Sequence, residues 1–166
     1  IITTLGEIVI ELEKEKAPIT VANFIKYIEG GYYNGGSFFR TVHMGNQPDS
    51  PVKITVIQGG CQARKQASLF DPILLERTKD TGLKHKDGTI SMARGVPDSA
   101  QDSFFICIGD QPELDFGGKR NPDGQGFAAF GTVIEGMNVV KEINQSPMEE
   151  QSLDPPIMIL EMLLIK

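Results

Sequence analysis

Near the start of the chain, apolar and polar residues alternate with a period of two. Ile8, Ile10 and Leu12 fall on one face of this pattern, and Glu7 and Glu11 fall on the other. Such alternation is typical of a β-strand with one buried and one solvated face. The chain therefore begins with a predicted strand that follows a turn.

The period of the pattern then changes to that of a helix. Apolar side chains recur at helical spacing at Val21, Phe24, Ile25 and Ile28. Pro18 suits the first turn of a helix, and Gly30 and Gly31 suit its end. We predict a helix over residues 19–29 that covers an open end of a sheet, and a second helix over residues 137–143.

The remaining apolar runs are short and are separated by segments rich in Gly, Pro, Asn and Asp. They predict further strands at residues 37–42, 52–58, 89–93, 103–108, 127–133 and 158–165. Many short strands with only two helices favour a sandwich or a closed barrel over a wound α/β sheet. With 166 residues and no linker or repeat, residues 1–166 form one predicted domain.

Charge and hydropathy exclude several classes of partner. The net charge is −6 and no run of Lys and Arg stands out, so neither nucleic acid nor an anionic membrane is an expected partner. The apolar stretches are far shorter than the roughly 18 residues that a membrane span needs. We expect no membrane-spanning segment.

The residues most often used in metal or nucleophilic chemistry are sparse. Cys61 and Cys107 form neither a CxxC motif nor a ligand cluster with His43 and His85, so we expect no metal site. Neither histidine accompanies a recognisable nucleophile motif. We interpret both as hydrogen-bonded or surface imidazoles.

A glycine-rich stretch, FGGKRNPDGQG, covers residues 116–126. It is not a phosphate-binding loop, because Glu113 and Arg120 occupy positions where that motif needs Gly and Ser or Thr. It is not an EF-hand calcium loop, because Lys119 and Phe130 would occupy the first and last ligand positions. We interpret it as a solvated surface loop.

Several ordered segments together resemble the cyclophilin family of peptidyl-prolyl isomerases. They are FFR at residues 38–40, VIQGG at 56–60, GTISMAR at 88–94, SFFI at 103–106, LD at 114–115 and FGTVIEGM at 130–137. The resemblance extends to LGEIVIEL, to APITVANF and to the closing apolar strand, so it covers nearly the whole chain. Met92, Ala93 and Arg94 make the bacterial branch the more similar one.

The resemblance implies an all-β fold with two helices: a closed eight-stranded antiparallel β-barrel capped by a helix at each end. A barrel of this size is filled by its own side chains, so substrate would bind on the outer face. The family requires no cofactor.

The resemblance also implies residue roles. Arg40 matches the catalytic arginine, and Gln58 matches a polar residue that supports it. The matching substrate-binding positions are Phe38, Val56, Met92, Ala93, Arg94, Ser103, Phe105, Leu114 and Phe127. Among them, Phe105 and Leu114 match the proline pocket.

Some positions depart from the family pattern. Thr55 and Val56 replace a Phe-Met pair, Ser103 replaces a glutamine, Glu113 replaces an aromatic residue, and Phe127 replaces a histidine or tyrosine. We expect a wider, less apolar proline site and weaker peptide binding. Insertions at residues 43–53 and 117–125 either reshape the substrate groove or decorate the barrel.

The sequence therefore predicts an enzyme that isomerises X–Pro bonds of proline-containing polypeptides and so assists folding. The alternative is a proline-peptide binding module with little or no turnover, and a weaker one is a scaffold that acts through its inserted loops. We expect a monomer. Because the chain begins at Ile1 rather than at Met, we expect an exported or periplasmic protein, with a cytoplasmic one as the alternative.

Overall fold

The computed structural model describes residues 1–62 and 69–166. Within them, ten antiparallel strands form one sheet, in the order β2-β1-β10-β4-β5-β7-β6-β8-β3 with β9 paired to β10. The strands are β1 (Ile2–Thr3), β2 (Gly6–Glu7), β3 (Val9–Leu12), β4 (Ser37–Val42), β5 (Val56–Gly60), β6 (Thr89–Met92), β7 (Phe104–Cys107), β8 (Ala129–Glu135), β9 (Met148–Glu149) and β10 (Ser152–Glu161).

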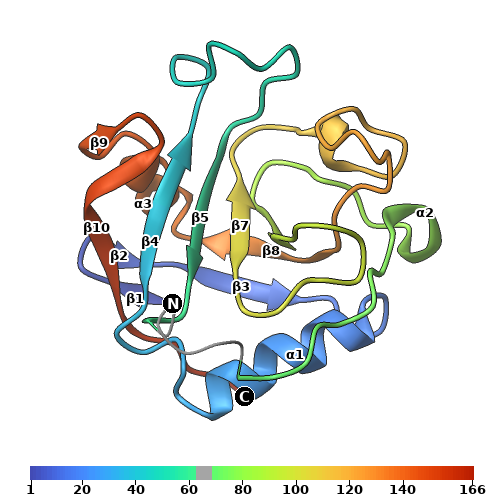
Figure 1. Ribbon diagram of the computed structural model, residues 1–166. Coiled ribbons are helices and arrows are strands. Elements are labelled where there is room, and N and C mark those ends of the chain that lie inside the picture. Colours follow the sequence, from blue (N-terminus) through green and yellow to red (C-terminus); the bar gives the residue numbers. More distant parts are fainter. Residues whose placement is uncertain (63–68) are drawn as a thin grey trace.

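The sheet curls into a nearly closed barrel (Figure 1). Ile8 alone separates β2 and β3, the first and last strands of this order, and the amino group of Ile1 donates to the Ile8 carbonyl oxygen at 2.7 Å. The Ile8 N–H donates back to the Ile1 carbonyl oxygen at 2.9 Å. The predicted fold class is confirmed, but the strand count of eight is too low, because strands of two residues carry no readable alternation.

Two strand boundaries differ clearly from prediction. The strand expected at residues 52–58 is β5 at Val56–Gly60, because residues preceding it belong to a hydrogen-bonded loop. The strand expected at 158–165 is β10, which begins at Ser152 and includes Pro155 and Pro156. Proline normally marks the limit of a strand, so sequence reasoning placed this boundary too late.

Both predicted helices are present. They are α1 (Pro18–Glu29) and α3 (Met137–Asn144), and the structure adds a short α2 (Thr78–Thr81) and a 3₁₀ turn, η2 (Pro112–Leu114). In Figure 1, α1 lies below the strands and α3 lies behind the upper part of β4. Among the described residues, no helix has the length and apolar content to cross a membrane.

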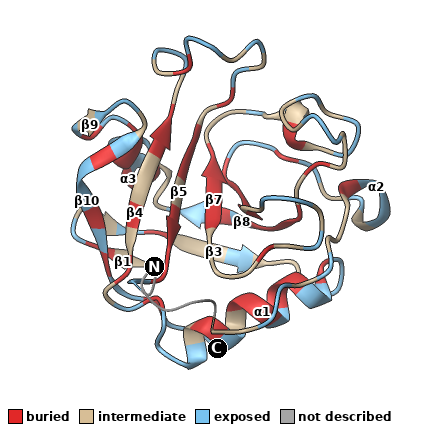
Figure 2. Cartoon of the chain, in the orientation of Figure 1, coloured by how far each residue is buried: buried red, intermediate tan, exposed pale blue. Residues whose placement is uncertain are grey.

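Aromatic side chains fill the barrel, and Figure 2 colours β7 as buried along its length. Phe104 is fully buried and meets Phe24 of α1, Tyr33 and Phe38 edge-on at centroid distances of 5.6, 5.6 and 5.7 Å. Edge-to-face contact is a favoured geometry for aromatic rings. A packed interior leaves only the outer wall for binding.

A second apolar cluster lies on the outer side of the wall formed by β4, β5 and β7. It consists of Val42, Ile54, Val56, Phe105, Cys107 and Leu114, with Ala93 and Phe127 packed against it. Successive side chains of a strand point to opposite faces, so Phe104 packs inside the barrel and Phe105 packs outside it. Most of this outer cluster lines a cavity on the outer wall of the barrel.

Candidate active site

Arg40 reaches the outer face because β4 contains a β-bulge. Phe38 pairs with Gly59 and Arg40 pairs with Gln58, so two residues of β4 advance for one of β5. Without the extra residue, Phe38 and Arg40 would point to the same side of the sheet. The bulge leaves Phe38 inside the barrel and turns Arg40 outward, beside the outer cluster.

Strand register places the key residues in one row across the wall. Arg40 of β4 is opposite Gln58 of β5, Gln58 is opposite Phe105 of β7, and Phe105 is opposite Ser91 of β6. Neighbouring strands lie about 4.8 Å apart. A cationic side chain, an amide and an aromatic ring therefore stand side by side on the same surface.

Two glutamine side chains hold the Arg40 guanidinium. Nη1 donates to Gln58 Oε1 at 3.0 Å, while Nε and Nη2 donate to Gln151 Oε1 at 3.0 and 2.8 Å. Among the described residues, these bonds occupy three of the five N–H groups of the guanidinium. One N–H on each terminal nitrogen therefore remains available to a ligand.

No carboxylate faces this guanidinium among the described residues. Burial lowers the pKa of Arg40 from its ordinary value, and the positive charge of Arg120 lowers it further. An arginine remains protonated at neutral pH despite such a shift. Arg40 is thus a fixed, charged donor without a neutralising counter-ion.

A cavity of about 220 Å³ opens over this row. Its lining combines three arginines with apolar side chains: Arg40, Ile54, Val56, Gln58, Ala93, Arg94, Phe105, Leu114, Arg120, Asn121, Pro122 and Phe127. A larger groove of about 480 Å³ lies elsewhere, between the chain ends, β3 and α1, and contains no arginine or glutamine. The smaller cavity is therefore the one of the two that combines cationic, amide and apolar side chains.

The apolar wall of the cavity is rigidly supported. Phe105 and Phe127 meet edge-on with ring centroids 5.6 Å apart. Leu114 is 1% exposed and Phe105 is 6% exposed. An apolar notch of this kind can hold a small ring such as that of proline and exclude water from it.

A hydrogen-bond network of polar side chains lies next to Phe105. His85 stacks on the Phe105 ring at 6.0 Å, its Nδ1 contacts Asp115 Oδ1 at 2.7 Å, and its Nε2 contacts Ser91 Oγ at 2.9 Å. Although burial by itself raises the pKa of Asp115, the hydrogen bonds from the His85 side chain and backbone bring it below its ordinary value. The interpretation of His85 as a hydrogen-bonded imidazole is confirmed.

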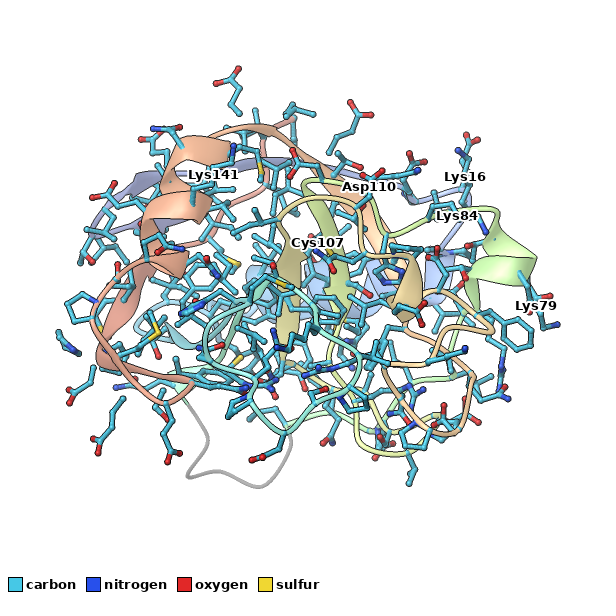
Figure 3. The ribbon with its side chains drawn as sticks, turned by 90° about the horizontal axis from the view of Figure 1, so that it is seen from above. Lys16, Lys79, Lys84, Cys107, Asp110 and Lys141 are labelled. Atoms are coloured by element: carbon cyan, nitrogen blue, oxygen red, sulfur yellow. The ribbon has the colours of Figure 1, made fainter. Side chains whose placement is uncertain are left out.

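Cys107 is a member of the outer cluster and lies near the middle of the molecule in Figure 3. Burial raises the pKa of its thiol, so the thiol stays protonated and acts as an apolar group. Lys79 of α2 lies at the edge of the molecule in the same view. No group of three or more His, Cys, Asp or Glu side chains in residues 1–62 and 69–166 could hold a metal ion.

The predicted insertion at residues 117–125 forms one rim of the cavity. Arg94 binds it by donating to both carboxylate oxygens of Asp123, at 2.8 and 3.0 Å, and to the carbonyl oxygen of Gly126. The Arg94 hydrogen bond lowers the pKa of Asp123. The Arg94 guanidinium also lies 4.8 Å from the Phe127 ring centroid, so it secures the rim.

Arg120 joins this loop to the other insertion. Its Nη1 donates to Gln47 Oε1 at 2.8 Å, to Ser50 Oγ at 2.9 Å and to the Val52 carbonyl oxygen at 2.6 Å. The insertions at residues 43–53 and 117–125 therefore meet above the cavity. Residues 116–126 form a surface loop, as predicted, and Arg120, Asn121 and Pro122 of this loop also line the cavity, so the insertion reshapes the groove rather than only decorating the barrel.

The structure brings together most of the predicted site residues. Arg40, Gln58, Val56, Ala93, Arg94, Phe105, Leu114 and Phe127 all line the cavity. Phe38 and Met92 do not, since both pack in the barrel core at 0% and 1% exposure. The expectation that these two contact substrate is corrected. Ser103 also lies outside the lining, and its carbonyl oxygen accepts the Ala93 N–H.

Sequence reasoning missed five residues of the site. They are Ile54, Arg120, Asn121, Pro122 and Gln151. All of them except Gln151 lie in the insertions at residues 43–53 and 117–125 or next to them. The only sequence signal for these four residues was that the insertions lie close to family motifs. Gln151 is 111 residues from Arg40 in sequence, and no local pattern marks it.

The comparisons agree with this geometry. Residues 1–163 match the family described as cyclophilin type peptidyl-prolyl cis-trans isomerase/CLD. The chain belongs to the cyclophilin family. This cyclophilin is 37% identical over 150 residues to peptidyl-prolyl cis-trans isomerase A of Dickeya dadantii, covering 89% of this chain and 70% of the relative. It is 38% identical over 144 residues to isomerase B of Escherichia coli, covering 85% and 80%.

Solved structures support the fold of this cyclophilin. A Cryptosporidium parvum cyclophilin, crystallised in the presence of the dipeptide Ala-Pro, superposes with a TM-score of 0.77 at 22% identity and covers 97% of this chain and 94% of its own. Cyclophilin AquaCyp293 from Hirschia baltica gives 0.74 at 21% identity and covers 96% and 70%. The bacterial isomerases are more similar in sequence than the isomerase-like 3 protein of chicken, which is 29% identical.

Proposed function

We propose that this cyclophilin catalyses cis–trans rotation about X–Pro bonds of extended polypeptides at the Arg40 cavity. One observation carries the proposal: the Arg40 guanidinium is fixed by Gln58 and Gln151 with two N–H groups left over, beside an apolar notch formed by Phe105 and Leu114. Family membership agrees with this activity.

The reaction explains why these residue types suffice. Resonance gives the peptide bond double-bond character and a rotation barrier of roughly 18–20 kcal/mol. In the twisted state this resonance is lost, and the proline nitrogen regains a lone pair that can accept a hydrogen bond. No covalent bond is made or broken, so the site needs a donor and a clamp rather than a nucleophile.

Each part of the site has a role in that rotation. The notch holds the proline ring and excludes water. Because water stabilises the planar, polar amide, its exclusion favours rotation. An Arg40 N–H then donates to the proline nitrogen more strongly in the twisted state than in the planar one, which lowers the barrier. A donor matched to a transition state contributes about 2.7–4 kcal/mol, so ring clamping and desolvation supply the rest of the acceleration.

The substrate class follows from the openness and position of the site. The cavity lies on the outer wall of the barrel, between rims formed by two loops, where an extended chain can reach it. The related Cryptosporidium structure was obtained in the presence of Ala-Pro. We therefore assign proline-containing polypeptides as the partners of this cyclophilin.

Exchange spectroscopy by NMR on a short X–Pro peptide tests the proposal. We expect cross-peaks between cis and trans resonances at substoichiometric protein, whereas uncatalysed exchange takes tens to hundreds of seconds. Saturable binding without exchange cross-peaks would contradict isomerase activity and favour the binding-module alternative.

A further inference from the structure

The cavity is positively charged in an acidic protein. The whole chain carries a net charge of −6, yet the residues that line the cavity include three arginines and no Asp or Glu. Arg94 is neutralised by Asp123. The other two arginines, Arg40 and Arg120, have no ion pair within the described part of the chain.

Both arginines are held by neutral oxygen atoms. Arg40 donates to two amide oxygens, and Arg120 donates to an amide, a hydroxyl and a carbonyl oxygen. Neutral acceptors orient a guanidinium without cancelling its charge. Two positive charges in one cavity repel each other, and a ligand carboxylate would relieve that repulsion.

The carboxylates of the surrounding loops form no salt bridge with Arg120 in the described structure. Asp123 binds Arg94, and Glu113 Oε2 accepts the backbone N–H of Lys119 at 2.7 Å. Asp49, on the facing insertion, is exposed and forms no ion pair in the described structure.

The hydrogen bonds of Arg120 leave its carboxylate-binding edge open. Only Nη1 is engaged, and Nε and Nη2 have no acceptor among the residues that the structure describes. Adjacent N–H groups on Nε and Nη2 are parallel and match the two oxygens of a carboxylate. The acceptor Gln47 is itself fixed, since its Nε2 donates to the carbonyl oxygens of His43 and Ile54 and it is 2% exposed. Arg120 is therefore preorganised.

We propose that this site selects X–Pro segments with an acidic side chain beside the proline, whose carboxylate is bound by Arg120 while Arg40 acts on the amide. This inference rests on the proposed isomerase function. The selectivity is local, because the overall negative charge of the protein disfavours acidic ligands at long range.

Matched peptides test this preference. The pairs are blocked Ala-Glu-Pro-Phe against Ala-Gln-Pro-Phe, and blocked Ala-Ala-Pro-Glu against Ala-Ala-Pro-Gln, which differ only in charge and place it on either side of proline. We expect kcat/KM to be about five-fold higher for the Glu member of at least one pair, as for a partly exposed charged hydrogen bond. The ratio should fall as ionic strength rises.

Variants assign the preference to one side chain. In Arg120→Gln the Glu/Gln ratio should fall to about one, and comparison within a single variant cancels any effect of loosened loops. Lys119→Gln removes the same charge one residue away, from an exposed side chain with no ion pair in the described structure, and should keep the ratio. A wild-type ratio of one in both pairs, or a preference that persists in Arg120→Gln, overturns the inference.

Peptide affinities separate this inference from the proposed function. Dissociation constants for the same peptides, from NMR titration, report the preference even without turnover. Turnover of all four peptides with no preference removes the role of Arg120 and leaves the isomerase function intact. Tighter binding of a Glu peptide without turnover of any peptide supports the role of Arg120 and removes the isomerase function.

Discussion

Arg40 depends on Gln151 as much as on Gln58. Gln151 Oε1 accepts hydrogen bonds from both Nε and Nη2, and its own Nε2 donates to the Asn46 carbonyl oxygen at 3.1 Å. A guanidinium has rotamer freedom that must be removed before it can donate at a fixed point. Gln151 is therefore a positioning residue that acts through Arg40.

We expect Gln151→Ala to lower kcat about tenfold, because a hydrogen bond to a charged group contributes about 1.5 kcal/mol. KM and the thermal unfolding midpoint should stay near their wild-type values. Steady-state kinetics on one X–Pro peptide, with a melting curve, measure this. A fall in the midpoint with unchanged kcat would indicate a structural role instead.

At the scale of elements, a bulge and two insertions form the site on a regular barrel wall. The family motifs predicted Arg40, Gln58 and Phe105, and the strand register places these three residues side by side across the wall. The motifs did not predict the bulge between Phe38 and Arg40, because Phe38 and Phe39 are both apolar and the sequence shows no regular alternation there from which an inserted residue could be recognised. The Arg120 contacts were also hidden, since they join segments 68 to 73 residues apart. The expected monomer and exported location stay predictions.

Asp115, which follows η2, accepts hydrogen bonds from the backbone and side chain of His85. This contact makes the stability of the protein depend on pH. The folded-state pKa of Asp115 lies below the ordinary value of 3.8, so this carboxylate contributes stability above that pH and the contribution is lost as pH falls through the folded-state pKa. We expect Asp115→Asn to lower the free energy of unfolding by about 1–3 kcal/mol at pH 7, because it disrupts a buried hydrogen bond of His85.

The difference between wild type and Asp115→Asn should begin to shrink as the pH falls below about 4, where the carboxylate of the unfolded chain becomes protonated, and should go on shrinking down to the lower folded-state pKa. Urea denaturation at a series of pH values checks this. Asp71→Asn is the matched control, since Asp71 is exposed and has no ion pair among the described residues. A loss that is constant with pH would mean that the charge of Asp115 contributes nothing.

At the scale of the whole molecule, the barrel wall separates stability from function. Phe104 and Phe105 are adjacent in sequence, yet one packs with the core and the other with the site. The sequence predicted a packed barrel with an external site. The family resemblance placed Phe105 at that external site, whereas the pattern of β7 alone could not decide on which side each ring lies, because every residue of β7 is apolar and buried.

We expect opposite effects from the same substitution at these two positions. Phe104→Leu removes core contacts and should cost about 1–2 kcal/mol of stability, with kcat/KM little changed. Phe105→Leu removes the ring that meets His85 and Phe127 and should lower kcat/KM about tenfold with a smaller loss of stability. Denaturation and peptide kinetics on both variants measure the contrast, and equal profiles would contradict the separation.

The assignment of Arg40 as the transition-state donor is tested by kcat/KM of Arg40→Ala and Arg40→Lys on a neutral X–Pro peptide, with a two-dimensional amide spectrum to verify the fold. We expect a loss of about 100-fold or more in Arg40→Ala. Lysine keeps the charge but lacks the planar fork, so Arg40→Lys should recover only a small part. Wild-type kcat/KM in a correctly folded Arg40→Ala protein would contradict the mechanism.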